Sequence, residues 1–298
     1  MRIAVLGASS FLARSIVAHW KHIGLTPTLF SRKTLTYPAS SGLPQTRFSI
    51  GSVEPALEEL ADFDVILYAA GAGVQSGDPA SSEELDLVNA TYPIRVLDHL
   101  KATGWKGRWI SFGSYFEIGD VTEPKALDES AFVEHQLSGH NPYCHSKKRL
   151  TQTIASFDQN VFCHHLVLPN AYGLGEDSGR LIPYLVNTLN KGQRPKLSAG
   201  LQRRQFLHIS DLYTAVDLAL NGRIPTGILN FTPVGAVAVR DVVAEVYQQM
   251  GIHDSPEFGA VQTRDQKMAH LELDPARAFS LGWRPRVSLD AGIATYLP

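Results

Sequence analysis

The segment Pro142-Tyr143-Cys144-His145-Ser146-Lys147 contains a phenol and an ammonium four residues apart. If the segment is helical, Tyr143 and Lys147 lie on one face, about one turn apart. A nearby ammonium lowers the pKa of a phenol from about 10 towards the range useful for proton transfer. The same spacing also suits an ordinary amphipathic helix, so the pair indicates acid–base chemistry only together with other residues.

A second candidate site is the run Gly7-Ala8-Ser9-Ser10-Phe11-Leu12-Ala13, which follows a short apolar strand. Where a strand turns into a helix, backbone N–H groups and the helix dipole point at a pyrophosphate. Of the three glycines in a Gly-x-x-Gly-x-x-Gly turn only Gly7 is present, and the small residues Ser10 and Ala13 replace the others. An ordinary buried turn explains the run equally well.

The residues after the second predicted strand bear on the choice of dinucleotide. A carboxylate there would bind the adenosine ribose 2′-hydroxyl and reject a 2′-phosphate. This chain has Ser31-Arg32-Lys33 instead. A hydroxyl and two cations favour NADP over NAD, although Lys33 by itself is better explained as part of a solvated basic loop.

Short apolar runs alternate with helical patterns in the first half of the chain, which is typical of a parallel sheet covered by helices on both faces. We therefore predict an α/β fold, a doubly wound parallel sheet of the Rossmann type with a smaller C-terminal lobe. The expected strands are residues 3–6, 28–30, 64–70, 108–112 and 164–168, the expected helices are 11–22, 83–103 and 143–154, and residues 169–173 are expected to form a loop.

The 298 residues are about two domains' worth of chain. In the second part of the chain, prolines separate short elements. We therefore expect residues 1–168 to form the sheet domain, to which segments near 205–232 return. Residues 169–298 are expected to form mainly the smaller lobe. No low-complexity linker separates the two, and a shared cleft is therefore expected.

Composition excludes several classes of function. A net charge of −2 gives no general attraction for nucleic acid or an anionic membrane. Two cysteines are too few for a disulfide framework, and His145, His164 and His165 lack zinc-site spacing, so no metal is expected. The N-terminus lacks the features of an export signal and no apolar run is long enough to span a bilayer, which predicts a cytoplasmic protein.

Taken in order, further motifs make the chain resemble the extended short-chain dehydrogenase/reductase family, particularly its members that modify nucleotide sugars. The resemblance runs almost end to end, and the shared order and spacing of its short motifs make it specific. Besides the turn and the Tyr143/Lys147 pair, it rests on Ala69-Ala70-Gly71, Val88-Asn89-Ala90, Ser111-Phe112-Gly113-Ser114, Pro169-Asn170-Ala171-Tyr172-Gly173, Gln202-Arg203-Arg204-Gln205-Phe206 with Asp211 beyond it, and Leu281-Gly282-Trp283-Arg284-Pro285.

The resemblance implies a nicotinamide dinucleotide cofactor and three catalytic residues. Tyr143 would protonate a substrate carbonyl oxygen, Lys147 would hold the nicotinamide ribose and lower the pKa of the phenol, and Ser114 would hydrogen-bond the same oxygen. Ser114 is preferred to Ser111 because it lies just past the strand. Asn89 would either complete a proton relay through water or bond structurally to the backbone. The implied cofactor-binding residues are Gly7, Ser9, Ser10, Phe11, Leu12, Ser31, Arg32, Ala69, Ala70, Gly71, Tyr143 and Lys147.

For the C-terminal lobe, the resemblance implies binding of a small nucleotide-sugar substrate. Asn170, Arg204 and Arg264 would contact its diphosphate, while Ser114 would contact the sugar. Guanidinium groups suit a diphosphate because they bind phosphate oxygens bidentately. Arg203 competes with Arg204, and since neighbouring side chains of a strand point to opposite faces, only one of them should face the cleft.

The residues beside Ser114 narrow the reaction. A 4,6-dehydratase of the family would carry Asp-Glu directly after the active-site Ser or Thr, and a decarboxylase would want an acidic residue there. This chain has Tyr115-Phe116, and Glu117 has no evident place at the sugar. The main hypothesis is therefore NADPH-dependent reduction of a nucleotide-linked 4-keto-6-deoxy sugar, with hydride going to C4 and Tyr143 as proton donor.

Three alternatives remain at this point. The first is a nucleotide-sugar 4-epimerase using tightly bound NAD, the second a reductase of steroid- or flavonoid-type ketones, and the third a non-catalytic dinucleotide-binding sensor or scaffold. Family analogy also implies a homodimer through the helices at 83–103 and 143–154, although their apolar faces would suit the sheet equally well.

Overall fold

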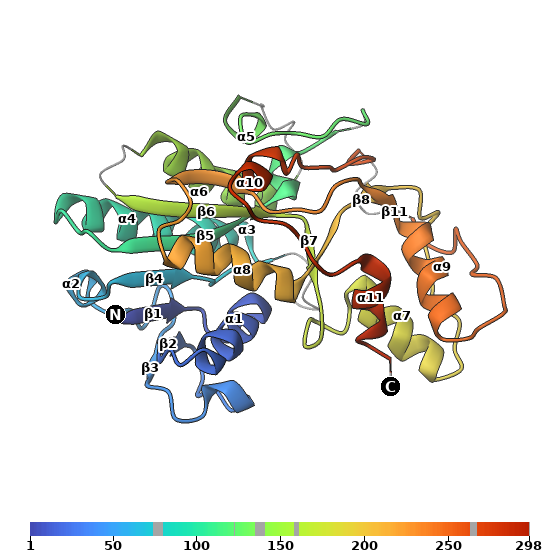
Figure 1. The fold of residues 1–298 in the computed structure, drawn as a ribbon, viewed down its shortest axis with the longest axis horizontal. Helices are drawn as coiled ribbons and strands as arrows, with labels where there is room; N and C mark the ends of the chain where they lie inside the picture. Colours follow the sequence, from blue (N-terminus) through green and yellow to red (C-terminus); the bar gives the residue numbers. More distant parts are fainter. Residues whose placement is uncertain (74–79, 122, 135–140, 158–160, 263–266, 298) are drawn as a thin grey trace.

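The computed structural model describes residues 1–73, 80–121, 123–134, 141–157, 161–262 and 267–297. Its main sheet has seven parallel strands in the order β10-β6-β5-β4-β1-β2-β3 (Figure 1). The strand order reverses between β1 and β4, where open α/β sheets bind ligands. The predicted doubly wound sheet is confirmed. Its strands are β1 (Ile3–Leu6), β2 (Thr28–Ser31), β3 (Gln45–Arg47), β4 (Val65–Tyr68), β5 (Arg108–Ser114), β6 (Phe162–Leu168) and β10 (Gly227–Asn230).

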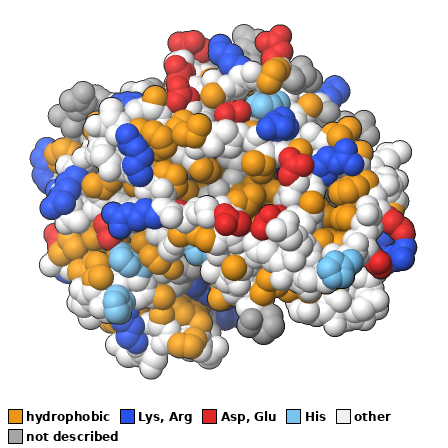
Figure 2. All heavy atoms as spheres, turned by 45° about the vertical axis from the view of Figure 1, so that its right-hand side comes forward, with side chains coloured by type: hydrophobic (Ala, Val, Ile, Leu, Met, Phe, Trp, Pro, Cys, Tyr) orange, Lys and Arg blue, Asp and Glu red, His pale blue; other side chains and the backbone are white. Residues whose placement is uncertain are grey.

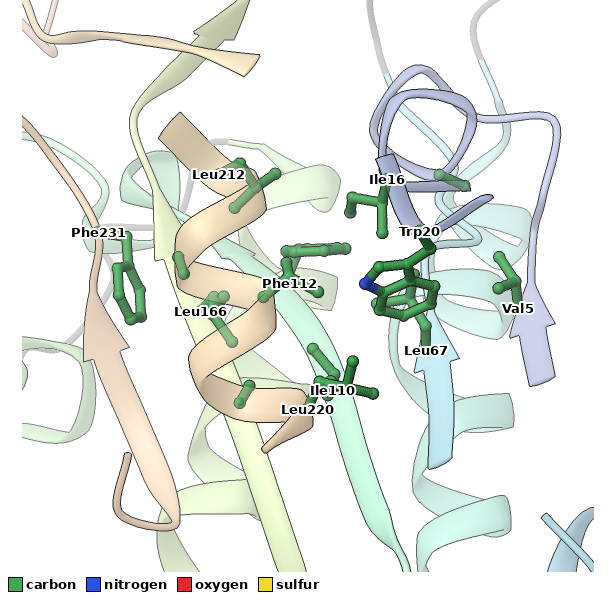
Figure 3. Close-up of a cluster of buried hydrophobic side chains, with 14 of the residues drawn as sticks. Val5, Ile16, Trp20, Leu67, Ile110, Phe112, Leu166, Leu212, Leu220 and Phe231 are labelled. Atoms are coloured by element: carbon green, nitrogen blue, oxygen red, sulfur yellow. The ribbon is translucent and has the colours of Figure 1, made fainter. Parts of the chain in front are cut away.

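Helices cover both faces of this sheet because successive side chains of each strand point to opposite sides. Val5 packs with α1 (Phe11–His22) and α8 (Ile209–Leu220), whereas its neighbour Leu6 packs in a second cluster on the other face. Figure 3 shows the first cluster, in which Trp20 of α1 lies near Ile110 and Leu67 of the sheet. The helices of the second face are α2 (Leu57–Ala61), α4 (Tyr92–Ala102) and α6 (Pro142–Ser156), and α3 (Ser82–Asp86) packs against α6.

The helix expected over residues 83–103 is interrupted. A π-helical segment, η2 (Leu87–Thr91), joins α3 to α4. Pro93 has no N–H to give to the carbonyl of Asn89, so the regular ladder of hydrogen bonds cannot continue there. The interruption turns the side chain of Asn89, which is 1% exposed, into the interior.

The smaller lobe lies at the right-hand end of Figure 1, beside the C-terminus. The prediction that residues 169–173 form a loop is wrong for three of them, because β7 (Asn170–Tyr172) pairs in parallel with the distant β9 (Phe206–His208). A second small pairing joins β8 (Arg203–Arg204) to β11 (Val237–Ala238). The remaining elements are α7 (Leu181–Asn190), α9 (Val239–Gln249), α11 (Leu289–Ala294), α5 (Ala131–Glu134), α10 (Ala276–Ser280), η1 (Pro38–Ser40) and η3 (Tyr115–Ile118).

The division into residues 1–168 and 169–298 stays a prediction, and the buried clusters give it a physical basis. Side chains of α7, α9 and α11 form a cluster of their own. The segment near 205–232 returns to the sheet, since α8 packs with α1 and β10 pairs with β6. Trp283, beyond that segment, also packs in the core of the sheet domain.

The surface carries no dominant charge. Figure 2 shows acidic and basic side chains spread among hydrophobic ones over one face of the molecule. Within the described residues, no helix combines the length and the apolar character needed to cross a membrane. The outward residues of α4 and α6 include Arg95, Asp98, Arg149 and Gln152, and dimer formation through these helices stays a prediction.

Asp211 ties the C-terminal segment to α8 and yields a prediction about stability. Its carboxylate is 3% exposed and accepts the N–H groups of Arg286 at 2.8 Å and Val287 at 3.2 Å. Asp211→Ala removes both hydrogen bonds, so the free energy of unfolding in urea should fall by about 2 kcal/mol. Asp211→Asn, which keeps an acceptor, should lose less. Equal stability of the Ala variant and the parent protein would contradict this account.

Candidate active site

The turn after β1 is held by backbone contacts. Gly7 has a φ of +83°, and its N–H and that of Ala8 both donate to the Phe30 carbonyl at 3.0 Å. A Cβ at Gly7 would lie 2.3 Å from the backbone nitrogen of Ala70, so only glycine lets β1 end against the residues that follow β4. Ser10 then caps α1 by accepting the N–H of Ala13 at 3.2 Å. The positive end of α1 therefore lies at the point where the strand order reverses.

A cavity of about 540 Å³ lies at this edge of the sheet and reaches the smaller lobe. Two residues of the turn after β1, Gly7 and Ser9, lie beside this cavity but outside its lining, as does Ala70, which follows β4. The cavity is bounded by the start of α1, the ends of β4 and β5, and α6. A doubly wound sheet binds a dinucleotide at this edge, with the pyrophosphate at a helix N-terminus. The predicted residues in its wall are Ser10, Phe11, Leu12, Ala69, Gly71, Ser114, Tyr143, Lys147 and Asn170.

Tyr143 and Ser114 both line this cavity, and the Ser114 hydroxyl acts on the phenol so as to lower its pKa. Asn141 caps α6 by accepting the N–H of Tyr143 at 2.9 Å, and Pro142 occupies the first helical position. Burial raises the pKa of Tyr143 to about 12, and the Ser114 hydroxyl opposes this rise only in part. The phenol therefore keeps its proton at neutral pH.

Lys147 lies one helical turn from Tyr143, but its ammonium donates to the carbonyl of Phe112. The expectation that Lys147 lowers the pKa of Tyr143 is therefore not met in this structure, because burial of the phenol is the larger effect. Burial also lowers the pKa of Lys147 itself, and the charge of Glu117 opposes that shift.

Asn89 also lines the cavity, and its amide is fully engaged by protein groups. Its Oδ1 accepts the N–H of Ala72 at 3.0 Å, while its Nδ2 donates to the Ala72 carbonyl at 2.9 Å and to Ser146 Oγ at 3.1 Å. Of the two roles considered for Asn89, these contacts match a structural hydrogen bond to the backbone.

A smaller pocket of about 280 Å³ adjoins the carboxyl ends of β2 and β3. Both predicted residues, Ser31 and Arg32, line it together with Lys33 and Arg47, and no carboxylate is among its lining residues. Ser31 is itself buried and donates to the Lys33 carbonyl at 2.5 Å. No pattern in the sequence pointed to Arg47, because β3 is short, polar and exposed and lacks an apolar pattern.

A third pocket, of about 240 Å³, is lined by Asn170 and Arg204 from the smaller lobe. Arg204 is 4% exposed and its guanidinium carbon lies 5.9 Å from the centre of the Phe116 ring. Arg203 is exposed and donates to the carbonyl of Ala236 instead. Of the two arginines, the structure therefore turns Arg204 into the pocket. Arg264 lies outside the described residues.

Arg180 was missed by the sequence reasoning. It lines both the large cavity and the Arg204 pocket, and its charge acts on Tyr143. Its Nε lies 2.7 Å from the carboxylate of Glu176, which also accepts the hydroxyl of Tyr296. Only the folded loop after β7 brings Arg180 back to the site, so no local sequence pattern could have identified it.

The histidines and cysteines take structural positions. His164 and His165 diverge from β6: the first contacts the Pro225 carbonyl at 3.1 Å and the second Ser111 Oγ at 2.8 Å. Cys144 and Cys163 are both buried. In the ranges that the structure describes, no three His, Cys, Asp or Glu side chains gather into a metal site.

Comparison with known proteins finds relatives along the whole chain. CDP-abequose synthase from Salmonella typhimurium is 24% identical over 306 residues, which cover 99% of this chain and 97% of the synthase. The CDP-abequose synthase of Yersinia pseudotuberculosis is 26% identical over 229 residues, 72% of each chain.

Two solved structures share the fold. WbmG of Bordetella bronchiseptica, in complex with NAD and UDP, superimposes with a TM-score of 0.82 at 22% identity, over 100% of this chain and 94% of WbmG. UDP-glucose 4-epimerase of Thermus thermophilus, in complex with NAD, gives a TM-score of 0.81 at 21% identity, over 98% and 96% of the two chains.

A family model decides the assignment. The model described as the NAD dependent epimerase/dehydratase family matches residues 3–230, from the first strand of the sheet to the last. This match confirms the predicted resemblance and indicates an enzyme of the short-chain dehydrogenase/reductase type. The chain belongs to the NAD-dependent epimerase/dehydratase family.

Proposed function

We propose that this protein is an NADPH-dependent reductase of a nucleotide-linked 4-keto-6-deoxy sugar. The observation that carries the proposal is that Tyr143 and Ser114 line one cavity, whose neighbouring pocket is lined by Arg32, Lys33 and Arg47. The pair provides a proton donor for a carbonyl oxygen, and the three cations suit a 2′-phosphate.

The residues of the cavity have separate tasks in this reaction. A nicotinamide cofactor, when bound, supplies the hydride. Tyr143 gives its proton to the carbonyl oxygen as charge develops there, and Ser114 holds the same oxygen through its hydroxyl. Since the pKa of Tyr143 is raised to about 12, the phenol starts the reaction as an acid, which suits reduction. Lys147 holds the ribose, and the charge of Arg180, which lowers the pKa of Tyr143, stabilises the tyrosinate that forms.

The substrate is proposed to extend from the sugar site towards the smaller lobe. Arg204 and Asn170 line one pocket, and Arg180 borders both that pocket and the catalytic cavity. Two guanidinium groups and an amide match the oxygens of a diphosphate. Because two of the relatives are CDP-abequose synthases, a CDP-linked sugar is the first substrate to test.

A 4-epimerase using tightly bound NAD is the second candidate. It is favoured by the NAD in the similar solved structures and by the family description. An epimerase takes and returns hydride within one binding event, so its cofactor can stay bound and need not be replaced by a fresh molecule after each turnover. The basic lining at Arg32 and Arg47 favours the reductase.

The first prediction from this proposal distinguishes the reductase from the epimerase. Mixed with NADPH and a CDP-linked 4-keto-6-deoxy sugar, the protein should consume NADPH, which is followed by nicotinamide absorbance. Tyr143→Phe should lower kcat roughly a hundredfold or more, because the proton donor is lost while the ring remains. Interconversion of a nucleotide sugar by protein that retains NAD, without NADPH consumption, would replace the reductase with the epimerase.

The second prediction concerns cofactor choice. The double variant Arg32→Ala/Arg47→Ala should raise the Kd for NADPH roughly tenfold or more, since charge-assisted hydrogen bonds to a phosphate are lost, and should change the Kd for NADH little. Arg2→Ala, at the opposite end of the strands, serves as the control. Equal losses for both cofactors would reject a 2′-phosphate site here.

The third prediction tests the substrate pocket with two neighbouring arginines. Arg204→Leu should raise the KM for the nucleotide sugar roughly tenfold, because a phosphate contact is removed. Arg203→Leu, whose side chain bonds to the Ala236 carbonyl, should leave the KM near that of the parent. Thermal denaturation of both variants checks that they fold. An unchanged KM in folded Arg204→Leu would favour the steroid- or flavonoid-type ketones.

A further inference from the structure

The loop between β7 and α7 contains one buried carboxylate among exposed residues. The side chain of Glu176 is 2% exposed, whereas Leu174 of the same loop is 64% exposed and Asp177 is also exposed. Glutamate side chains are rarely buried to this degree unless they are paired. Since Glu176 lines the Arg204 pocket, its partners bear on what that pocket can bind.

Glu176 has two side-chain partners from different parts of the chain. Its Oε2 lies 2.7 Å from Nε of Arg180, at the other end of the loop. Its Oε1 accepts the hydroxyl of Tyr296, which follows α11 near the C-terminus (Figure 1). The oxygen of Tyr296 in turn accepts the N–H of Gly173 at 2.6 Å. These contacts join both ends of the loop to the C-terminal segment.

The contact with Glu176 fixes the direction of the Arg180 guanidinium. Its Nη2 also donates to the carbonyl of Ala171 at 3.1 Å. A guanidinium has five N–H donors, so these two bonds leave three. In the part of the chain that the structure describes, no protein acceptor takes the N–H groups of Nη1. Because Arg180 borders both the catalytic cavity and the Arg204 pocket, these donors can bond to a substrate that spans the two.

A further contact holds the loop from the side of the sheet domain. Nη2 of Arg14, in α1, donates at 2.5 Å to the carbonyl of Gly175, which directly precedes Glu176. The loop is therefore attached to α1 on one side and to Tyr296 on the other. A side chain positions a ligand only as precisely as its own supports allow, so this double attachment suits a loop that presents a binding group.

We propose that Tyr296 and Glu176 are positioning residues of the substrate site, which together hold the guanidinium of Arg180 where it contacts the diphosphate of the substrate. The inference rests on the role given to Arg180 in the proposed function. It assigns a task in substrate binding to the C-terminal segment, since Tyr296 lies 120 residues from Glu176 in the sequence.

The variant Tyr296→Phe tests this role because it removes the hydroxyl and keeps the ring. CDP and UDP are the probes, since they carry the diphosphate and cannot accept hydride, and calorimetry measures their Kd. Because Arg180 would be less well oriented, the Kd of the nucleotide that the parent binds should rise roughly fivefold. An unchanged Kd in the folded variant would overturn the proposal.

Tyr184→Phe is a matched control in the same lobe. The hydroxyl of Tyr184, in α7, accepts the N–H of Lys196 at 2.8 Å, as that of Tyr296 accepts the N–H of Gly173. Tyr184 lines neither the Arg204 pocket nor the catalytic cavity. The control should therefore keep the Kd of the parent even if its thermal stability falls. An equal rise in Kd in both variants would assign the effect to general loosening of the lobe and reject the proposal.

A double-mutant cycle shows whether Tyr296 acts through Arg180. Arg180→Met should by itself raise the Kd roughly tenfold, because a charge-assisted contact with phosphate is lost. Adding Tyr296→Phe to Arg180→Met should raise the Kd no further. If Tyr296→Phe raises the Kd by the same factor with and without Arg180, it acts independently of Arg180, and the proposal fails.

The same variants separate a failure of this inference from a failure of the proposed function. If Arg180→Met binds the nucleotide as the parent does, or the parent binds neither CDP nor UDP, the diphosphate site is rejected together with this inference. If Arg180→Met weakens binding and Tyr296→Phe does not, only the role of Tyr296 and Glu176 is rejected. Neither result depends on whether the reaction is a reduction or an epimerisation.

A measurement on the parent protein covers the case in which Tyr296→Phe does not fold. Arginine side-chain NMR, with the Nε signal of Arg180 assigned by its loss in Arg180→Met, reports how firmly the guanidinium is held. An order parameter near the value of a rigid backbone, about 0.85, is expected. A value below about 0.6, which is typical of flexible segments, would overturn the proposal.

Discussion

The close contact between Gly7 and the backbone of Ala70 is the constraint on which the site depends. β1 and β4 are neighbours in the sheet but are separated in sequence by β2 and β3, so the chain has to leave them in opposite directions. That arrangement brings the start of α1 and the residues after β4 to one crevice. A side chain at Gly7 would overlap Ala70, and the crevice would have to open.

The side chains proposed to carry out the reaction come from the end of β5 and the start of α6, which border the same crevice. Ser114 ends β5, and Tyr143 lies in the first turn of α6, held there by the Asn141 cap. Both line one cavity although the residues are far apart in sequence. Burial then decides the chemistry: it keeps the phenol protonated and lowers the pKa of Lys147, whereas the charge of Glu117 opposes the fall in the pKa of Lys147. The site is thus a balance between desolvation and paired charge.

The smaller lobe adds positive charge to a molecule with a net charge of only −2. The pairing of β8 with β11 holds Arg204 at this pocket, and the pairing of β7 with β9 holds Asn170 there. Arg180 is held by Glu176, which is held in turn by Tyr296 near the C-terminus. Residues from several parts of the chain therefore line one pocket. A near-neutral protein can bind a dianionic group in this way because only the local field matters at contact distance.

The sequence alone was enough to predict the doubly wound sheet, the turn at Gly7 and the Tyr143/Lys147 pair, because apolar periodicity and short helical spacing act between near neighbours. Other features became visible only in the folded chain. These are the strand character of Asn170–Tyr172, the inward side chain of Arg204, the presence of Arg47 and Arg180 in the pockets, and the hydrogen bond from the Ser114 N–H to Glu117. The tertiary structure also reversed the expected pKa shift of Tyr143. These features depend on partners distant in sequence and on the degree of burial, and neither quantity is contained in the local order of residues.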